Sequence, residues 1–268
     1  MKVLAAFVCL FACTTTAVAM VGGATAAAPA TARHLVLIVG SRGNFCTGTA
    51  IAADLVLTAA HCVLPGAEYK LVEYDANHRP RLADVREVTR HPQFSLQTLL
   101  AHRATADVAL LKLAVPLKPP FAAAPLAAER PVTVGDRFVV AGFGVAVRGD
   151  GKTGGTARAA DLVATGQPGT LQLRLVDPAG KGERAGLGAC TGDSGAPAFD
   201  MERGIPMVAG VVSWSTGPRL TAGCGGLTGI TPLARYRGWI IETARKLGSA
   251  LPVATAPKSA VPESTAPK

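Results

Sequence analysis

Short apolar runs separated by turn residues fill most of the chain from about Leu35 onward. The clearest runs are "HLVLIVG", "LVLTAA", "DVALLKL", "RFVVAGFG", "TLQLRLV" and "PMVAGVVSW", with Gly, Pro, Asn or Asp between them. Runs of this kind are typical of β-strands. Sustained helical periodicity is found only in "YRGWIIETARKLG", near the end of the apolar part of the chain. The pattern predicts an all-β fold with one C-terminal α-helix.

A proline-rich stretch divides the β pattern into two parts. Residues 116–131, "PLKPPFAAAPLAAERP", contain prolines that resist incorporation into a sheet. We therefore expect one lobe at about 35–115, a connector at 116–131, a second lobe at about 132–235 and a helix at about 236–247. Residues 249–268 are rich in Ala, Pro, Ser, Thr and Lys without periodicity, which predicts a disordered tail.

The N-terminus has the pattern of a signal peptide. Lys2 precedes an apolar run, and small residues ending in "AVA" at 17–19 form an A-x-A cleavage pattern. The run is too short to span a bilayer. We expect residues 1–19 to be removed, giving a secreted or periplasmic protein without stable membrane insertion. Acylation at Cys13 is the alternative to cleavage after Ala19.

Cysteine usage agrees with export. Removing residues 1–19 leaves four cysteines, an even number that favours disulfides in an oxidising compartment. Four cysteines allow three pairings, between which the sequence does not decide. Their spacing lacks the C-x2-4-C pairs of structural zinc sites, so no metal and no cofactor are expected. The four are Cys46, Cys62, Cys190 and Cys224.

The formal net charge of +9 does not by itself indicate a nucleic-acid partner. The basic residues are scattered, and no aromatic–basic interleaving suggests a nucleic-acid face. A solvated basic surface accounts for the charge, and we expect a monomer that does not bind nucleic acid.

Three short motifs supply the groups of a nucleophilic hydrolase. "TAAHC" contains His61, "ADVALLKL" contains Asp107 and "GDSG" contains Ser194. A serine hydroxyl is a poor nucleophile unless a base accepts its proton, and the best base is an imidazole oriented by a carboxylate. The order His, Asp, Ser differs from that of subtilisins and α/β-hydrolases. The G-x-S-x-G elbow is also missing, because Ala196 occupies its last position.

These motifs, in this order and spacing, resemble those of trypsin/chymotrypsin-like serine proteases of a bacterial kind. The resemblance extends from about Met20 to Leu247 and implies two packed antiparallel β-barrels with the active site in the cleft between them. It implies that Ser194 attacks a peptide carbonyl, His61 transfers the proton and Asp107 orients His61. Polypeptides would be the substrates.

The same resemblance assigns roles to the neighbouring residues. The backbone N–H groups of Gly192 and Ser194 would form the oxyanion hole, where glycine permits the close approach of substrate. Cys46 would pair with Cys62, and Cys190 with Cys224.

"MVGG", from Met20 to Gly23, is similar to the family's mature Ile-Val-Gly-Gly start. We expect cleavage after Ala19 to free an ammonium at Met20 that pairs with the carboxylate of Asp193. The exported enzyme would then be active without a separate propeptide.

Substrate preference rests on fewer residues. The family's pocket floor corresponds to Gly188, next to Ala189, and no acidic residue lies between Ala185 and Cys190, which argues against cleavage after Lys or Arg. "VSWS" resembles the family's Ser-Trp-Gly wall, with Ser213 near Asp107 and Trp214 lining the pocket. Ser215 replaces the usual glycine and would narrow the entrance, which favours small or medium apolar side chains.

A second class of function remains open at this point. A protease-like fold can persist as a catalytically silent binding protein, because fold alone does not determine function. Such proteins usually lose a member of the triad, and here none is missing, so an exported serine endopeptidase is the preferred interpretation.

Overall fold

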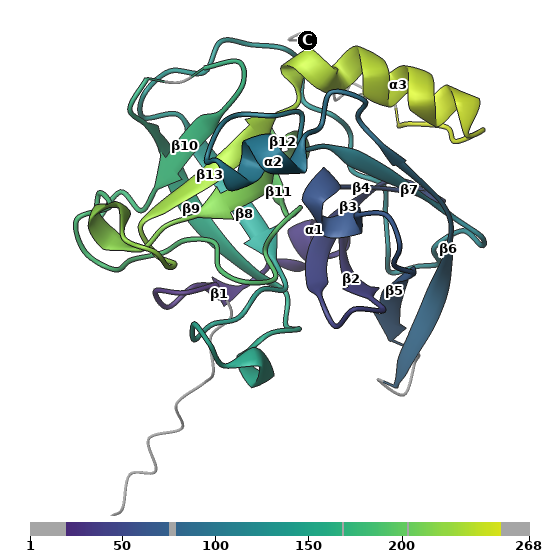
Figure 1. The fold of residues 1–268 in the computed structure, drawn as a ribbon, viewed down its shortest axis with the longest axis horizontal. Coiled ribbons are helices and arrows are strands. Elements are labelled where there is room, and N and C mark those ends of the chain that lie inside the picture. The colour runs from purple at the N-terminus through teal and green to yellow at the C-terminus, as the bar shows by residue number, and fades with distance from the viewer. Residues whose placement is uncertain (1–19, 75–78, 168, 203, 253–268) are drawn as a thin grey trace, which may run out of the picture.

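Two closed antiparallel β-barrels make up most of the molecule (Figure 1), a computed structural model that describes residues 20–252 except 75–78, 168 and 203. The first barrel closes in the order β2-β3-β4-β7-β6-β5. Its strands are β2 (Leu35–Gly40), β3 (Phe45–Ala52), β4 (Leu55–Thr58), β5 (Tyr69–Tyr74), β6 (Pro80–Arg90) and β7 (Ala109–Leu113).

The second barrel has the order β9-β10-β13-β12-β11-β8, closed by pairing of β8 with β9. Its strands are β8 (Arg137–Gly142), β9 (Arg158–Thr165), β10 (Leu173–Val176), β11 (Pro197–Glu202), β12 (Ile205–Ser215) and β13 (Leu227–Pro232). A two-residue strand, β1 (Thr25–Ala26), adds to the outer edge of β9. The all-β fold with two antiparallel barrels is therefore confirmed.

Each of the six apolar runs contains a strand, because continuous apolar stretches are the strands buried on both sides. All five residues of β7 are buried, and β4 is likewise buried along its length. The six runs do not include β3, β5, β6, β9, β11 or β13. Of these, β6 has the weakest apolar signal, because its residues are exposed or half-buried throughout and include several charges. This strand is held by backbone pairing with β5 and β7, which a local apolar pattern does not reveal.

Within residues 20–252, helices are few and short. They are α1 (Pro29–Ala32), α2 (Leu96–Leu100) and α3 (Arg237–Lys246), with 3-10 turns η1 (Ala60–Val63), η2 (Gly151–Thr153), η3 (Pro218–Leu220) and η4 (Ala234–Tyr236). The predicted terminal helix corresponds to α3. It follows the second barrel in sequence, but Ile240 and Ala244 pack in one cluster with Ile51 and Leu55 of the first barrel. Figure 1 shows α3 lying beside β4 and β7.

The segment after α3 continues this contact, which corrects the predicted start of the tail. Ser249 is only 8% exposed, and its hydroxyl donates to Asp54 Oδ1 at 2.7 Å and accepts from Lys112 Nζ at 2.8 Å. Lys112 also forms an ion pair with Asp54. Residue 249 is therefore part of the folded domain, because it completes a partly buried charge cluster. Residues 253–268 of the predicted tail, and all of 1–19, lie outside the described residues.

The connector joins the barrels without forming a strand of its own. Its backbone makes an isolated bridge from Leu126 to Val208 of β12. Ala124 and Leu126 are buried in the cluster that also contains Phe199 and Leu57, one from each barrel. The two barrels thus share an apolar interface. None of the helices described is long and apolar enough to cross a membrane.

Candidate active site

His61 and Asp107 are brought together by neighbouring strands of the first barrel. His61 lies in η1, directly after β4, and Asp107 comes shortly before β7, which pairs with β4. Asp107 is fully buried; its Oδ1 accepts from the His61 backbone N–H at 2.9 Å and its Oδ2 lies 2.7 Å from His61 Nδ1. Ser213 also donates its hydroxyl to Oδ2, as the resemblance implies. The buried carboxylate therefore contacts His61 twice, once at its backbone N–H and once at its imidazole.

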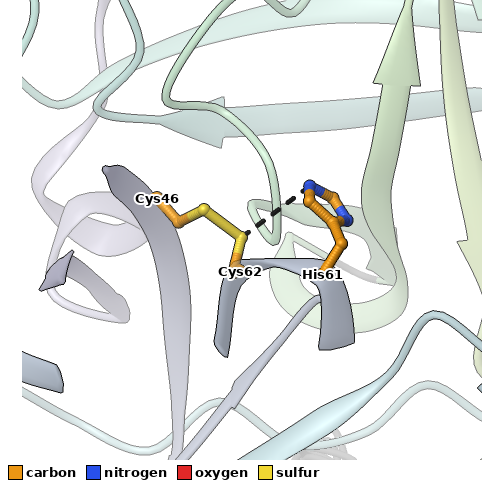
Figure 2. A group of neighbouring side chains, drawn as sticks. All are labelled: Cys46, His61 and Cys62. Atoms are coloured by element: carbon orange, nitrogen blue, oxygen red, sulfur yellow. Dashed lines mark hydrogen bonds between the residues drawn. A yellow bond between two sulfur atoms is a disulfide. The ribbon is translucent and has the colours of Figure 1, made fainter. Parts of the chain in front are cut away.

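Cys46, His61 and Cys62 lie close enough together to suggest a metal site, but the sulfur atoms are already bonded to each other (Figure 2). His61 Nε2 lies 4.0 Å from Cys62 Sγ. Zinc binds cysteine as a thiolate, which a disulfide sulfur cannot supply. The predicted Cys46–Cys62 bridge is confirmed, and it ties the turn that carries His61 to β3.

Ser194 faces His61 across the cleft between the barrels. Both residues line one open cavity of about 330 Å³, together with Trp214 and Ser215. Among the described residues, no hydrogen bond joins Ser194 Oγ to His61 Nε2. Catalytic hydrogen bonds are often long in unliganded enzymes and shorten when substrate is bound. Ser194 and His61 thus border a common cleft, and the buried Asp107, which does not line it, is already hydrogen-bonded to His61.

The loop before Ser194 presents two backbone amides without partners. Among the described residues, the N–H groups of Gly192 and Ser194 donate to no acceptor, whereas the intervening Asp193 N–H donates to Cys190 O at 3.0 Å. Gly192 has a φ of +95°, and a Cβ there would lie 2.0 Å from the ring of Phe45. Only glycine fits this position. Two free amides, at Ser194 and two residues before it, are donors of the kind that an oxyanion hole requires.

Asp193 points away from the cleft into the second barrel. Its fully buried carboxylate accepts from Gly144 N at 2.8 Å and from Cys190 N at 2.9 Å. Burial raises the pKa of the Asp193 carboxyl to about 7, against the opposing effect of these two amides. No cation among the described residues forms an ion pair with it, so the carboxylate lacks a compensating charge.

The segment that begins at Met20 is inserted into the same region. Met20 is fully buried in a cluster with Ala189 and Ala196, which lie on either side of Asp193 in the sequence. Val21 forms an antiparallel bridge with Gly188. Two of the predicted activation residues therefore lie in one buried region, although no contact between Met20 and the Asp193 carboxylate is among those described.

The predicted pocket residues divide into two groups. Ala189, Trp214 and Ser215 line the cleft, and the hydroxyl of Ser215 donates to Gly223 O at 3.2 Å. Gly188 does not border this cavity, because its backbone is packed against Gly225.

The second predicted bridge, Cys190–Cys224, is also present and joins the nucleophile loop to the segment before β13. Thr228 on β13 accepts from Ala189 N at 3.0 Å, a pocket contact that the motifs did not indicate. None of the described residues that line the cleft is acidic, and Asp107 is buried behind His61.

Comparison with known proteins agrees with this geometry. The family model described as Trypsin matches residues 20–240. The chain belongs to the trypsin family. It is 27% identical to snake venom serine protease rhinocerase 4 of Bitis rhinoceros over 215 residues, covering 78% of this chain and 81% of the relative. It is 31% identical to the vitellin-degrading protease of Bombyx mori over 219 residues, covering 75% and 77%.

Among solved structures, human heparin binding protein superposes with a TM-score of 0.67 at 26% identity, covering 87% of this chain and all of that one. The relatives named as proteases support a proteolytic function for this trypsin-family chain. They do not test the bacterial origin, which stays a prediction.

Sequence reasoning missed Thr47, which lies between the two barrels at the nucleophile loop. Its backbone N–H donates to Ser194 O at 2.9 Å and its hydroxyl donates to Gly192 O at 2.9 Å. No motif singles out this residue, and its contacts are distant in sequence. Its position directly after Cys46 was the only available signal.

Proposed function

We propose that the protein is an exported serine endopeptidase that hydrolyses peptide bonds through an acyl-enzyme intermediate. The observation that carries this proposal is the pair of unpartnered amides at Gly192 and Ser194, beside a His61 already hydrogen-bonded to buried Asp107. A serine with no catalytic role would not need both a positioned imidazole and two unpartnered backbone amides next to it.

In the proposed reaction, Ser194 Oγ attacks the scissile carbonyl while His61 Nε2 accepts its proton. The carbonyl oxygen becomes an oxyanion that accepts from the amides of Gly192 and Ser194. His61 then protonates the leaving amine as the peptide bond breaks. Water hydrolyses the acyl-enzyme by the same steps, releasing the acid and regenerating Ser194. Asp107 stays ionised and stabilises the imidazolium.

Small or medium apolar side chains are the proposed preference before the scissile bond. None of the described residues that line the cleft is acidic, so none would pair with Lys or Arg, and Ser215 on the cleft wall is hydrogen-bonded to Gly223. Apolar walls from Val212 and Trp214 would contact such a side chain.

The proposed activation step is release of the amino terminus at Met20. A free ammonium there would supply the cation that buried Asp193 lacks, since Met20 is buried in the same region. Two observations support export with cleavage at this point. The signal pattern ends at Ala19, and the two disulfides are typical of oxidising compartments. We propose a secreted or periplasmic location.

Cleavage of a peptide library by the protein beginning at Met20 tests this function, with Ser194→Ala as the matched control. We expect hydrolysis that Ser194→Ala abolishes, with Ala, Val or Leu enriched before the cut. A catalytically silent binding protein would leave the library intact in both samples. Cleavage mainly after Lys or Arg would keep the reaction but overturn the proposed preference.

A further inference from the structure

The hydroxyl of Thr47 joins the two barrels at the oxyanion loop. Thr47 is fully buried on β3 of the first barrel. Its Oγ1 donates to Gly192 O at 2.9 Å and accepts from Phe143 N at 3.0 Å, and both of these partners belong to the second barrel. One side-chain oxygen therefore satisfies two buried backbone groups, each of which would otherwise lose a hydrogen bond.

The backbone around Thr47 holds this oxygen in place. The Thr47 N–H donates to Ser194 O at 2.9 Å, and the Thr47 carbonyl accepts from Thr58 Oγ1 at 2.8 Å. A β-branched side chain on a paired strand also has few rotamers. The hydroxyl is thus carried by a strand of the first barrel that pairs with β2, and the Thr47 N–H also ties this strand to Ser194.

Gly192 needs such a constraint because glycine can adopt many backbone conformations. The carbonyl on its N-terminal side, Thr191 O, accepts from Val145 N at 2.8 Å. The Gly192 carbonyl itself is held by Thr47. With both carbonyls fixed, the Gly192 N–H between them is directed by contacts from two different barrels.

We propose that Thr47 is a positioning residue through which the first barrel sets the oxyanion hole; this inference rests on the proposed protease function. Thr47 touches neither substrate nor the reacting atoms. Its hydroxyl fixes the peptide that follows Gly192 and so keeps the Gly192 amide directed at the developing oxyanion. The geometry of the oxyanion hole then depends on the correct packing of the two barrels.

A matched control lies two residues away on the same strand. Thr49 is equally buried, lies on the same side of β3 by strand alternation, and its hydroxyl has no hydrogen-bond partner among the described residues. Thr49→Val therefore makes the same chemical change as Thr47→Val without removing a hydrogen bond. Thr47→Ser retains the hydroxyl and removes only a methyl group.

The experiment measures kcat and KM for the three variants and the wild type on a cleaved peptide, and the affinity of a peptide aldehyde whose oxygen would occupy the hole. We expect Thr47→Val to lower kcat roughly 10- to 100-fold with KM little changed, because misdirecting a donor weakens binding of the transition state more than of the substrate. Aldehyde affinity falls in parallel. Thr47→Ser and Thr49→Val stay within about threefold of the wild type.

Equal kcat values for Thr47→Val and Thr49→Val would overturn the proposal. Loss of activity in Thr47→Ser would also overturn it, because that variant keeps the hydroxyl and loses only the packing of the methyl group. Amide hydrogen exchange at Phe143 separates this question from the activity itself. If the wild type has no turnover, the proposed function fails, and exchange alone decides the role of Thr47. Faster exchange in Thr47→Val than in Thr49→Val supports the hydroxyl contact, whereas equal exchange contradicts it.

Discussion

We predict that Asp193 makes the stability of this protein depend on where its chain begins. The perturbation is a short polar extension before Met20, compared with a chain that starts at Met20, both carrying Ser194→Ala to prevent self-cleavage. In the extended form the buried carboxylate faces no cation, since its partners are two backbone amides. In the form that starts at Met20, we expect the free ammonium to compensate the charge.

The magnitude follows from the pKa of Asp193, which burial raises from an ordinary 3.8 to about 7. At low pH the carboxyl is protonated in both the folded and unfolded states, and no penalty arises. As the pH rises from about 4 to 7, the unfolded state ionises first and the folded state loses stability. Above pH 7 the loss reaches about 4 kcal/mol.

Urea unfolding at pH 4 and pH 8 measures this effect, with Asp193→Asn in each form as the reference for other titrating groups. We expect the extended form to lose about 4 kcal/mol between these pH values relative to its Asp193→Asn counterpart. In the form that starts at Met20, Asp193→Asn should instead destabilise at pH 8, by about 3 kcal/mol, because it breaks a buried ion pair. The same pH dependence in both forms would refute the reasoning.

Three further substitutions test separate parts of the structure. Ser213→Ala removes a hydrogen bond from the buried Asp107 carboxylate and should lower kcat about tenfold, as measured by steady-state kinetics; an unchanged kcat would mean that the contact does not support the triad. Gly192→Ala places a Cβ against a phenylalanine ring at a φ of +95° and should lower kcat about 100-fold, and normal turnover would contradict the oxyanion assignment. Ser249→Ala removes the hydroxyl that contacts Lys112 and should lower the free energy of unfolding by about 1–3 kcal/mol in urea titrations, whereas no change would place residue 249 outside the folded domain.

The sequence predicted the fold well where information is local. Continuous apolar runs gave the buried strands, such as β4 and β7, and the prolines at 116–131 gave the connector. It failed for β6, whose exposed charged residues satisfy no apolar pattern and whose pairing partners lie elsewhere in the chain. It also ended the domain too early, because the contact that buries Ser249 is with Asp54, 195 residues away.

The candidate site shows the same division. Short motifs of adjacent residues were enough to identify His61, Asp107 and Ser194 as candidates. The contact between Ser213 and Asp107 followed from the resemblance. The role of Thr47 could not be predicted from the sequence, because its hydroxyl contacts Gly192, which lies 145 residues away. The burial of Asp193, and hence its raised pKa, likewise depends on how the second barrel closes around it.

Covalent labelling of the protein that starts at Met20 tests the central claim most directly. Mass spectrometry after incubation with a fluorophosphonate measures whether a serine hydroxyl has been activated, independently of any choice of peptide. We predict a single adduct on Ser194 that is lost in Ser194→Ala and formed much more slowly in His61→Ala. A folded protein that starts at Met20 and remains unlabelled would contradict the account of this chain as a serine protease.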